Sequence, residues 1–326
     1  MEERSKIRVG ITHGDMNGVG YEVILKAFSD PAMFELCMPI VYGSPKVAAY
    51  HRKALNLQTN FSIINSADEA QDDKLNILSC TDDELKVELG KPTEEAGKAA
   101  LDALEKALSD YRDGLIDVLV TAPINKHTIQ SESFHFPGHT DYIEERVGGG
   151  NKALMILLKN DFNIGCPRIA VFSLNPHAGD NGLIGDEEAE IIIPAMQEMQ
   201  AKGIQCFGPY PADGFMGSGN FVHFDGILAM YHDQGLAPFK ALAMDEGVNY
   251  TAGLPIVRTS PAHGTAYDIT GQGVASEDSF RQAIYTALDV YRNRVIEKEI
   301  HARPLRKQYY EKRDDSDKLK LDSIED

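Results

Sequence analysis

Short apolar runs alternate along the chain with segments of helical periodicity, a pattern that predicts an α/β protein. The clearest helix is predicted over 93–112, where Thr93 can cap the first turn and apolar residues recur every three or four positions. Gly114 follows at the position of a helix C-cap. The apolar runs that alternate with the helices cover 7–12, 39–42, 116–121, 154–158, 168–174 and 225–231.

Three further helices are predicted over 22–28, 186–202 and 279–299. Pro194 lies inside the second of them and predicts a kink, because proline removes a backbone hydrogen bond from the helix. The last segment, 301–326, is mostly charged, so we expect a solvated tail or an arm on the surface.

Three polar clusters directly follow apolar runs, at 14–20, 175–180 and 232–235. In open α/β sheets, ligands bind outside the carboxyl ends of the strands, so these loops predict one composite site. The glycines of the first cluster could bring backbone N–H groups to an anion, or could simply make a tight turn between strand and helix. Their spacing is not that of a dinucleotide-binding motif, so both interpretations stay open.

The chain has 326 residues, a length that suggests two domains. Its 32 basic and 50 acidic residues give a formal net charge of −18, which argues against nucleic acid or an anionic membrane as the main partner. A small anionic substrate would need a local basic pocket. No long apolar run or signal-peptide pattern is present, and the four cysteines are scattered, so we expect a cytoplasmic protein with no membrane segment.

Histidines in the polar clusters are candidate metal ligands. His177 and His232 each follow an apolar run, and Asp180 and Asp233 lie close enough in sequence to orient them. No closely spaced metal-binding motif exists, so ligands would have to converge from separate loops, and ordinary surface histidines remain the alternative. His139 follows Pro-Gly and precedes Thr-Asp, where a surface role is equally open.

A second polar series and a glycine-rich loop follow the last cluster. Arg258 suits bidentate recognition of phosphate or carboxylate, whereas Lys240 could supply a charge or a base. Each could also be an ordinary surface residue or a member of an ion pair. The loop 260–275 contains three glycines and Asp268, which makes it a plausible nucleotide-binding loop.

Together these motifs resemble the 4-hydroxythreonine-4-phosphate dehydrogenase family, NAD-dependent enzymes of pyridoxal phosphate biosynthesis. The most specific matches are Asn-Pro-His-Ala-Gly at 175–179 and Tyr-His-Asp-Gln-Gly-Leu at 231–236. The loop that begins at His263 also resembles that of isopropylmalate and isocitrate dehydrogenases, where it holds the adenosine half of NAD. The other matching stretches are 11–20, 121–126, 137–141, 208–213 and 253–260.

The resemblance implies the two-domain α/β fold of the isocitrate and isopropylmalate dehydrogenases, with the active site in the cleft between the domains. We assign 1–122 and 245–300 to the first domain, 123–244 to the second domain with a homodimer interface, and 301–326 to a charged tail. The family site is shared across the homodimer.

The resemblance also implies roles for individual residues. The divalent metal, which is zinc, magnesium or cobalt, would be bound by His177 and His232. The substrate contacts would be His139, Thr140, Lys240, Asn249 and Arg258, with Lys240 and His139 as the catalytic candidates. The residues that would bind NAD or NADP are His263, Gly264, Thr265, Ala266 and Asp268.

The implied reaction is the oxidation of 4-phosphooxy-L-threonine at C3, followed by decarboxylation to 3-amino-2-oxopropyl phosphate. Two alternatives remain: a related dehydrogenase of erythronate or threonate 4-phosphate, and a metal-dependent phospho-ligand-binding or acyltransferase-type protein without hydride transfer. One departure bears on the metal. The family carries a third histidine ligand in a segment of roughly forty residues, enough for a strand and a crossover helix, that is missing here where Phe162 meets Asn163.

Overall fold

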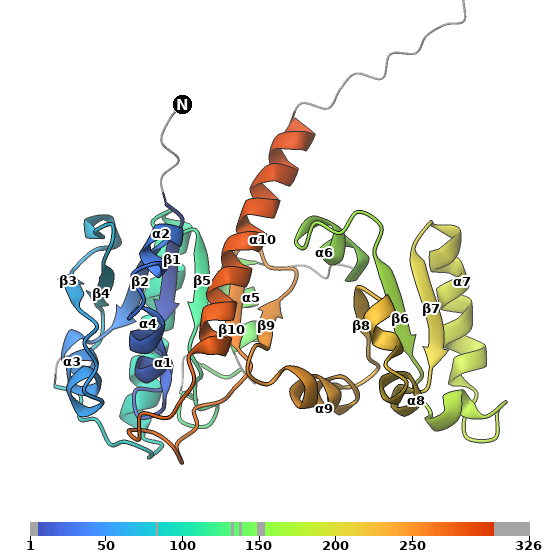
Figure 1. The fold of residues 1–326 in the computed structure, drawn as a ribbon, viewed down its shortest axis with the longest axis horizontal. Helices are drawn as coiled ribbons and strands as arrows, with labels where there is room; N and C mark the ends of the chain where they lie inside the picture. The colour runs from blue at the N-terminus through green and yellow to red at the C-terminus, as the bar shows by residue number, and fades with distance from the viewer. Residues whose placement is uncertain (1–5, 83, 132–133, 137–138, 149–153, 303–326) are drawn as a thin grey trace, which may run out of the picture.

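Two separate β-sheets organise the chain and lie side by side (Figure 1), and the long C-terminal helix α10 (Asp278–Ala302) packs against the larger of them. The computed structural model describes residues 6–82, 84–131, 134–136, 139–148 and 154–302. Within these residues the larger sheet has seven strands and the smaller sheet has three. The α/β architecture predicted from the alternating pattern is therefore confirmed.

The larger sheet has the strand order β3-β4-β2-β1-β5-β10-β9. All its described neighbours are parallel except β9, which runs antiparallel to β10. Its strands are β1 (Arg8–Thr12), β2 (Met38–Gly43), β3 (Phe61–Ile64), β4 (Leu75–Ser79), β5 (Val118–Thr121), β9 (Val248–Thr251) and β10 (Val257–Pro261).

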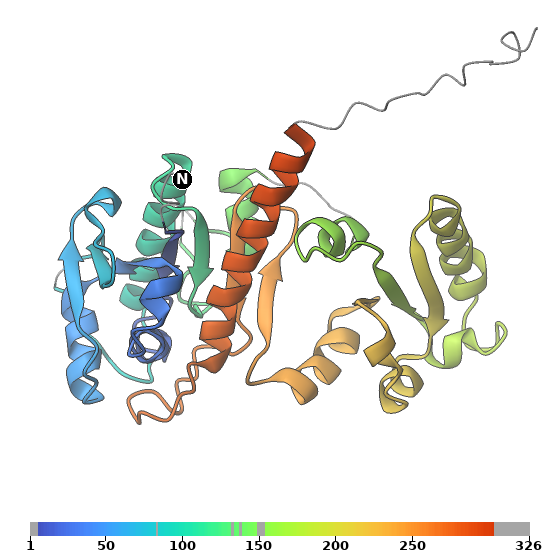
Figure 2. The same ribbon diagram turned by 45° about the horizontal axis from the view of Figure 1, so that its top comes forward.

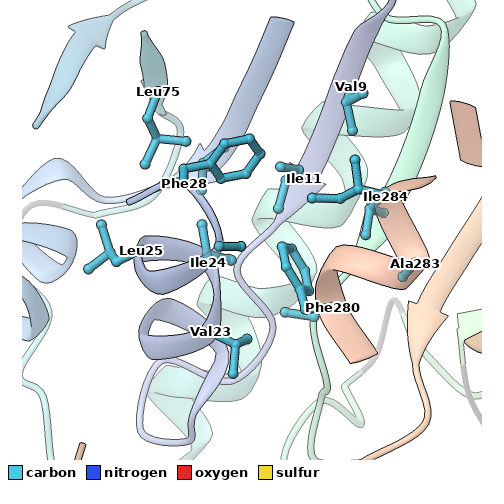
Figure 3. Packing of buried hydrophobic residues seen from close by; sticks show 14 of the residues in the cluster. Val9, Ile11, Val23, Ile24, Leu25, Phe28, Leu75, Phe280, Ala283 and Ile284 are labelled. Atoms are coloured by element: carbon cyan, nitrogen blue, oxygen red, sulfur yellow. The ribbon is translucent and has the colours of Figure 1, made fainter. Parts of the chain in front are cut away.

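Both faces of the sheet's central strands are buried, which is why β1, β2 and β5 are largely apolar. On one face, α1 (Gly20–Ala27) and α10 pack on Val9 and Ile11 of β1, as Figure 3 shows for Phe28, Phe280 and Ile284. On the other face, α4 (Glu94–Arg112) and α5 (His139–Val147) cover a second cluster that includes Leu119. The remaining helices of this lobe are α2 (Met33–Leu36) and α3 (Pro45–Ala54).

The smaller sheet has the parallel order β7-β6-β8 and forms the second lobe (Figures 1 and 2). Its strands are β6 (Arg168–Phe172), β7 (Gln205–Tyr210) and β8 (Gly226–Leu228). The helices α6 (Leu154–Asn160) and α7 (Ile193–Ala201) contribute to the cluster on one face, and α8 (Ala212–Gly217) to the cluster on the other. From β8 the chain returns to β9 through α9 (His232–Ala243).

Most sequence-based boundaries agree with the structure to within a few residues, and the exceptions have local causes. The helix predicted over 93–112 is α4, capped by the Thr93 hydroxyl, which accepts from the Ala96 N–H at 3.2 Å. The helix predicted over 186–202 is divided: a π-helical turn, Glu188–Ile192, precedes α7, and Pro194 stands in the first turn of α7. The run 225–231 pairs over only three residues, and α10 extends through residues 301 and 302.

The junction between Phe162 and Asn163 is anchored to the larger sheet's lobe. Asp161 is 2% exposed and accepts from Arg294 of α10 at 2.8 Å and from the Tyr250 hydroxyl of β9 at 2.6 Å. The proposed domain boundaries remain a prediction. No helix in the described part of the chain has both the length and the apolar character needed to cross a bilayer.

Candidate active site

A cleft of about 640 Å³ lies where β5, β9 and β10 end near the starts of α5 and α9. Carboxyl ends of parallel strands form one of its walls, as expected for an α/β fold. Seven of the residues proposed from the sequence line it, namely His139, Thr140, His232, Asn249, Arg258, His263 and Gly264. Five do not, namely His177, Lys240, Thr265, Ala266 and Asp268.

Arg258 is the central cation of this cleft. It is 6% exposed, and its Nε and Nη2 donate to the Thr121 hydroxyl at 3.1 and 2.5 Å, while Nη1 donates to the Thr251 hydroxyl at 3.0 Å. Burial lowers the pKa of Arg258 to about 10, so the guanidinium stays charged at neutral pH. No carboxylate in the described residues pairs with it, and a buried charge without a counter-ion is a receptor for an anion.

His139 begins α5 and lies beside this guanidinium, with Arg258 Nη2 at 3.2 Å from His139 Nδ1. Burial and the neighbouring charge of Arg258 hold the pKa of His139 well below its usual value, so the imidazole is neutral. Arginine can only donate, so Nδ1 is the acceptor and the proton resides on Nε2. His139 is therefore a hydrogen-bond donor to whatever occupies the cleft.

Lys126 also lines the cleft, although nothing in its immediate sequence distinguishes it beyond its place in the matching stretch 121–126. Its charge is close enough to His139 to contribute to the lowered pKa of that imidazole. With Arg258 it gives the cleft two cations against one lining carboxylate, Asp141, in a chain whose net charge is −18. This is the local basic pocket that an anionic substrate requires.

The loop that begins at His263 lies at one end of the cleft and packs against the glycine cluster 14–20. Burial lowers the pKa of His263, and its Nε2 has no hydrogen-bond partner in the described structure. The Val19 N–H donates to the Thr265 carbonyl at 3.0 Å, and Tyr267 donates to Asp15 at 2.7 Å. Asp268 is exposed. The two loops thus hold each other in place beside the cleft.

The glycines of the first cluster serve this packing. A Cβ at Gly18 would lie 2.7 Å from the Thr265 carbonyl oxygen, and one at Gly14, whose φ is +71°, would collide with the Pro123 carbonyl oxygen. Residues 13–20 are all buried. Of the two interpretations, the structure favours the tight turn over an open anion-binding loop.

His177 lies in an unusual backbone segment. All residues from 177 to 182 have positive φ, and only two of the six are glycines. Left-handed conformations cost roughly 1–2 kcal/mol per non-glycine residue, and such strain clusters at functional sites. Asn175, whose side chain and N–H bond Glu188 at 2.9 and 2.7 Å, anchors the start of this segment. The strain supports a functional role for His177.

His232 is exposed at the start of α9, and its Nδ1 lies 2.7 Å from Asp233 Oδ1, an arrangement that leaves Nε2 for a ligand. However, the described residues contain no group of three or more His, Cys, Asp or Glu side chains that could hold one metal ion. The donor set of a single chain therefore does not fit a complete metal site. Lys240 is exposed on α9 and is not among the residues that line the cleft.

Comparisons with known proteins point to a single family. The family model of the pyridoxal phosphate biosynthetic protein PdxA matches residues 35–160 and 152–287. A curated relative from Bacteroides thetaiotaomicron, named 4-hydroxythreonine-4-phosphate dehydrogenase, is 68% identical and the match covers 99% of this chain and 100% of the relative. A D-threonate 4-phosphate dehydrogenase from Cupriavidus necator is 34% identical over 85% of this chain and 95% of the relative.

Among solved structures, a 4-hydroxythreonine-4-phosphate dehydrogenase from Klebsiella pneumoniae superposes with a TM-score of 0.72 at 29% identity, covering 89% of this chain and 99% of that chain. The alignment to the Bacteroides relative spans 362 positions, at least 36 more than this chain has residues. The family match also divides near residue 160. Both findings agree with a segment missing after Phe162.

Proposed function

The chain belongs to the pyridoxal phosphate biosynthetic PdxA family, and from this premise we propose that it oxidises 4-phosphooxy-L-threonine at C3 with a nicotinamide cofactor. The oxidised product then loses carbon dioxide to give 3-amino-2-oxopropyl phosphate. The observation that carries this proposal is Arg258, a buried guanidinium at the cleft with no carboxylate partner in the described residues.

The substrate would bring an anionic group to Arg258, since Asp141, which also lines the cleft, forms no ion pair with it in the described residues. Arg258 binds one of them, and the Nε2–H of His139 donates to a neighbouring oxygen. Asn249, held by a 3.0 Å bond to the Pro261 carbonyl, and Thr140 at the start of α5 orient the rest of the molecule. His263 and Gly264, with Thr265, Ala266 and Asp268 shaping the loop, would hold NAD or NADP, which would supply a hydride acceptor.

The proton of the oxidised hydroxyl needs an acceptor, and His139 is a poor one because it already carries its proton on Nε2 toward a hydrogen bond. Lys240 remains our candidate base. It does not line the cleft of its own chain, and neither does His177, so both support a homodimer in which a second copy completes the site. His177 and His232 remain proposed ligands for zinc, magnesium or cobalt. The described residues of one chain supply no cluster of three ligands for such an ion.

The proposal is tested by NADH formation with 4-phosphooxy-L-threonine, threonate 4-phosphate and erythronate 4-phosphate, each with and without a chelator. We expect the first to be the best substrate, and threonate 4-phosphate is the second candidate because curated relatives include threonate phosphate dehydrogenases. Arg258→Gln should raise KM about tenfold or more, since a hydrogen bond to a charged group contributes about 1.5–3 kcal/mol. The exposed Arg292→Gln is the matched control.

Three outcomes would change this assignment. No NADH with any substrate, while phosphorylated ligands still bind, would leave a phospho-ligand-binding or acyltransferase-type protein. A higher kcat/KM for threonate or erythronate phosphate would make it a paralogous dehydrogenase. NADH formation that a chelator leaves unchanged would remove the metal from the scheme.

A further inference from the structure

The hydrogen bonds around Arg258 are made with neutral partners only. Of its five N–H groups, the one on Nε and the two on Nη2 contact Thr121 and His139, and one of the two on Nη1 contacts Thr251. Burial lowers its pKa, and no ion pair joins it to a carboxylate in the described residues. Buried arginines are normally paired with carboxylates, and the absence of such a partner in the described residues is a specific feature of this cleft.

The register of the strands brings the hydroxyls of Thr121 and Thr251 to the guanidinium of Arg258. Thr251 of β9 stands directly opposite Arg258 of β10 in the antiparallel pair, so their side chains share one face of the sheet. Arg258 is also paired with Leu119 of the parallel β5, and Thr121 follows two residues later on the same face. The guanidinium therefore extends from the middle of β10 toward the carboxyl end of β5, where the cleft begins.

We propose that Thr121 and Thr251 are positioning residues that hold Arg258 in place without neutralising it, so that its charge remains available to an anionic group of the substrate. Hydroxyl oxygens satisfy the N–H groups of a buried guanidinium and contribute no negative charge. A carboxylate at either position would pair with the guanidinium and compete with the ligand. This inference rests on the proposed function, because it concerns the same cleft.

These hydrogen bonds also determine which N–H groups of Arg258 and His139 remain available to a ligand. With four N–H groups occupied, Arg258 keeps one Nη1–H, and His139 keeps its Nε2–H, with no acceptor for either in the described residues. These two donors suit an oxyanion that accepts one bond from each. Because Thr121 takes both Nε–H and one Nη2–H, its loss would let the guanidinium rotate and would release His139 from its tautomer.

The decisive variant is Thr251→Asp, which is close to threonine in size and supplies the missing counter-ion. We expect it to raise the melting temperature of the ligand-free protein and to abolish the rise that inorganic phosphate causes in the wild type. Its KM for the phosphorylated substrate should increase about tenfold or more, with a smaller change in kcat. Thr251→Ser keeps the hydroxyl. It should retain the phosphate-induced rise in melting temperature, and its KM should stay within about twofold of the wild-type value.

Thr259→Val is the matched control. Thr259 lies next to Arg258 on β10, but its hydroxyl donates to the Ala283 carbonyl of α10 at 2.7 Å on the other face. This variant should lower the melting temperature and leave the phosphate-induced shift and KM unchanged. If Thr251→Asp does not fold, Thr121→Ser and Thr121→Val carry the same test, with loss of the phosphate shift expected only for valine.

The outcomes separate the two proposals. If phosphate does not stabilise the wild-type protein and no substrate is oxidised, the proposed function fails. If phosphate stabilises the wild type and Thr251→Asp equally, or if Thr251→Ser binds as poorly as Thr251→Asp, the positioning role is wrong while the proposed function stands.

Discussion

Two buried histidines lie behind the glycine cluster and stack on one tyrosine. The rings of His13 and His51 lie on either side of Tyr21, with centroid distances of 5.0 and 5.3 Å. Each histidine is 1% exposed, and His51 Nε2 is 2.8 Å from the Met16 carbonyl oxygen, so it carries the proton there. Burial lowers the pKa of both imidazoles to about 4, so both are neutral in the folded protein at neutral pH.

These two groups predict a loss of stability in mild acid. Between pH 6.5 and about 4 the unfolded chain binds protons that the folded chain does not, so the free energy of unfolding falls as the pH drops through this window. Each histidine contributes a slope of about 1.4 kcal/mol per pH unit. His51→Gln should remove about half of the slope attributable to the pair, as measured by urea unfolding at several pH values. The exposed His127→Gln should leave this slope unchanged. An equal reduction in that control would contradict the assignment of the slope to the buried histidines.

At the residue scale, the sequence could indicate the ionisable members of the site but not the hydroxyl groups that hold them. Arg258 and His139 stand out in the sequence because their side chains can bind an anion, and the structure brings them together. Thr121 and Thr251 do not stand out, because threonine has no distinctive chemistry and its role here depends on strand register. Thr121 lies 137 positions from Arg258. Its place within a matching stretch at the end of an apolar run was the only available signal.

At the element scale, one helical glycine sets how closely α4 approaches the loop that carries Lys126. Gly97 is in the first turns of α4, and a Cβ there would collide with the carbonyl oxygen of Thr128. A glycine inside a helix normally costs about 1 kcal/mol relative to alanine. Here the close approach of helix and loop requires it, because the obstructing atoms belong to backbone.

Gly97→Ala should therefore destabilise the protein by about 1–3 kcal/mol, the usual cost of overpacking, although helix propensity alone predicts a gain. Gly214 in α8 is the matched comparison, since a Cβ there meets no atom within 4 Å. Gly214→Ala should be neutral or stabilising. Unfolding midpoints in urea measure both, and a stabilising Gly97→Ala would show that the loop at Thr128 moves freely.

The sequence predicts an element well where several independent features, such as periodicity and capping residues, indicate the same boundaries. For α4, periodicity, the Thr93 cap and the following glycine all point to the same boundaries. The run 154–158 has no such support, and it is the start of α6, a helix, because five apolar residues fit either element. The run 225–231 was longer than β8, since pairing with β6 extends over only three residues.

At the scale of the whole molecule, the two lobes differ in how completely their cores are filled. The larger sheet is covered on both faces, whereas the buried residues around the smaller sheet are few: Leu158, Ile169, Val171, Met196 and Cys206 on one face, and Ala170, Phe172 and Phe215 on the other. A cavity of about 290 Å³ with an almost wholly apolar lining opens between α6, α7 and the smaller sheet. Ile191 and Leu228, which line it, are 63% and 45% exposed.

The cavity adjoins the segment that links α6 to β6, since Ile164 of this segment packs on the same cluster. Apolar surface left open to water forgoes the free energy of burial, and regions with few buried contacts open first. The second lobe should therefore unfold locally before the first, so that the cleft residues on β5 and β10 keep their framework while α9 and the segment around His177 loosen.

Hydrogen exchange measures this difference directly. We expect the backbone amides of β6 and β7 to exchange faster than those of β1 and β5, which are central in the larger sheet. Ala195 lines the cavity, so Ala195→Leu should fill part of it, slow exchange in β6 and β7 by an amount equivalent to about 1 kcal/mol, and leave β1 unchanged. Ala201→Leu, at the end of the same helix and outside the cavity, should have no such effect. Equal protection of both sheets would mean that the smaller sheet is as stable as the larger one despite its cavity.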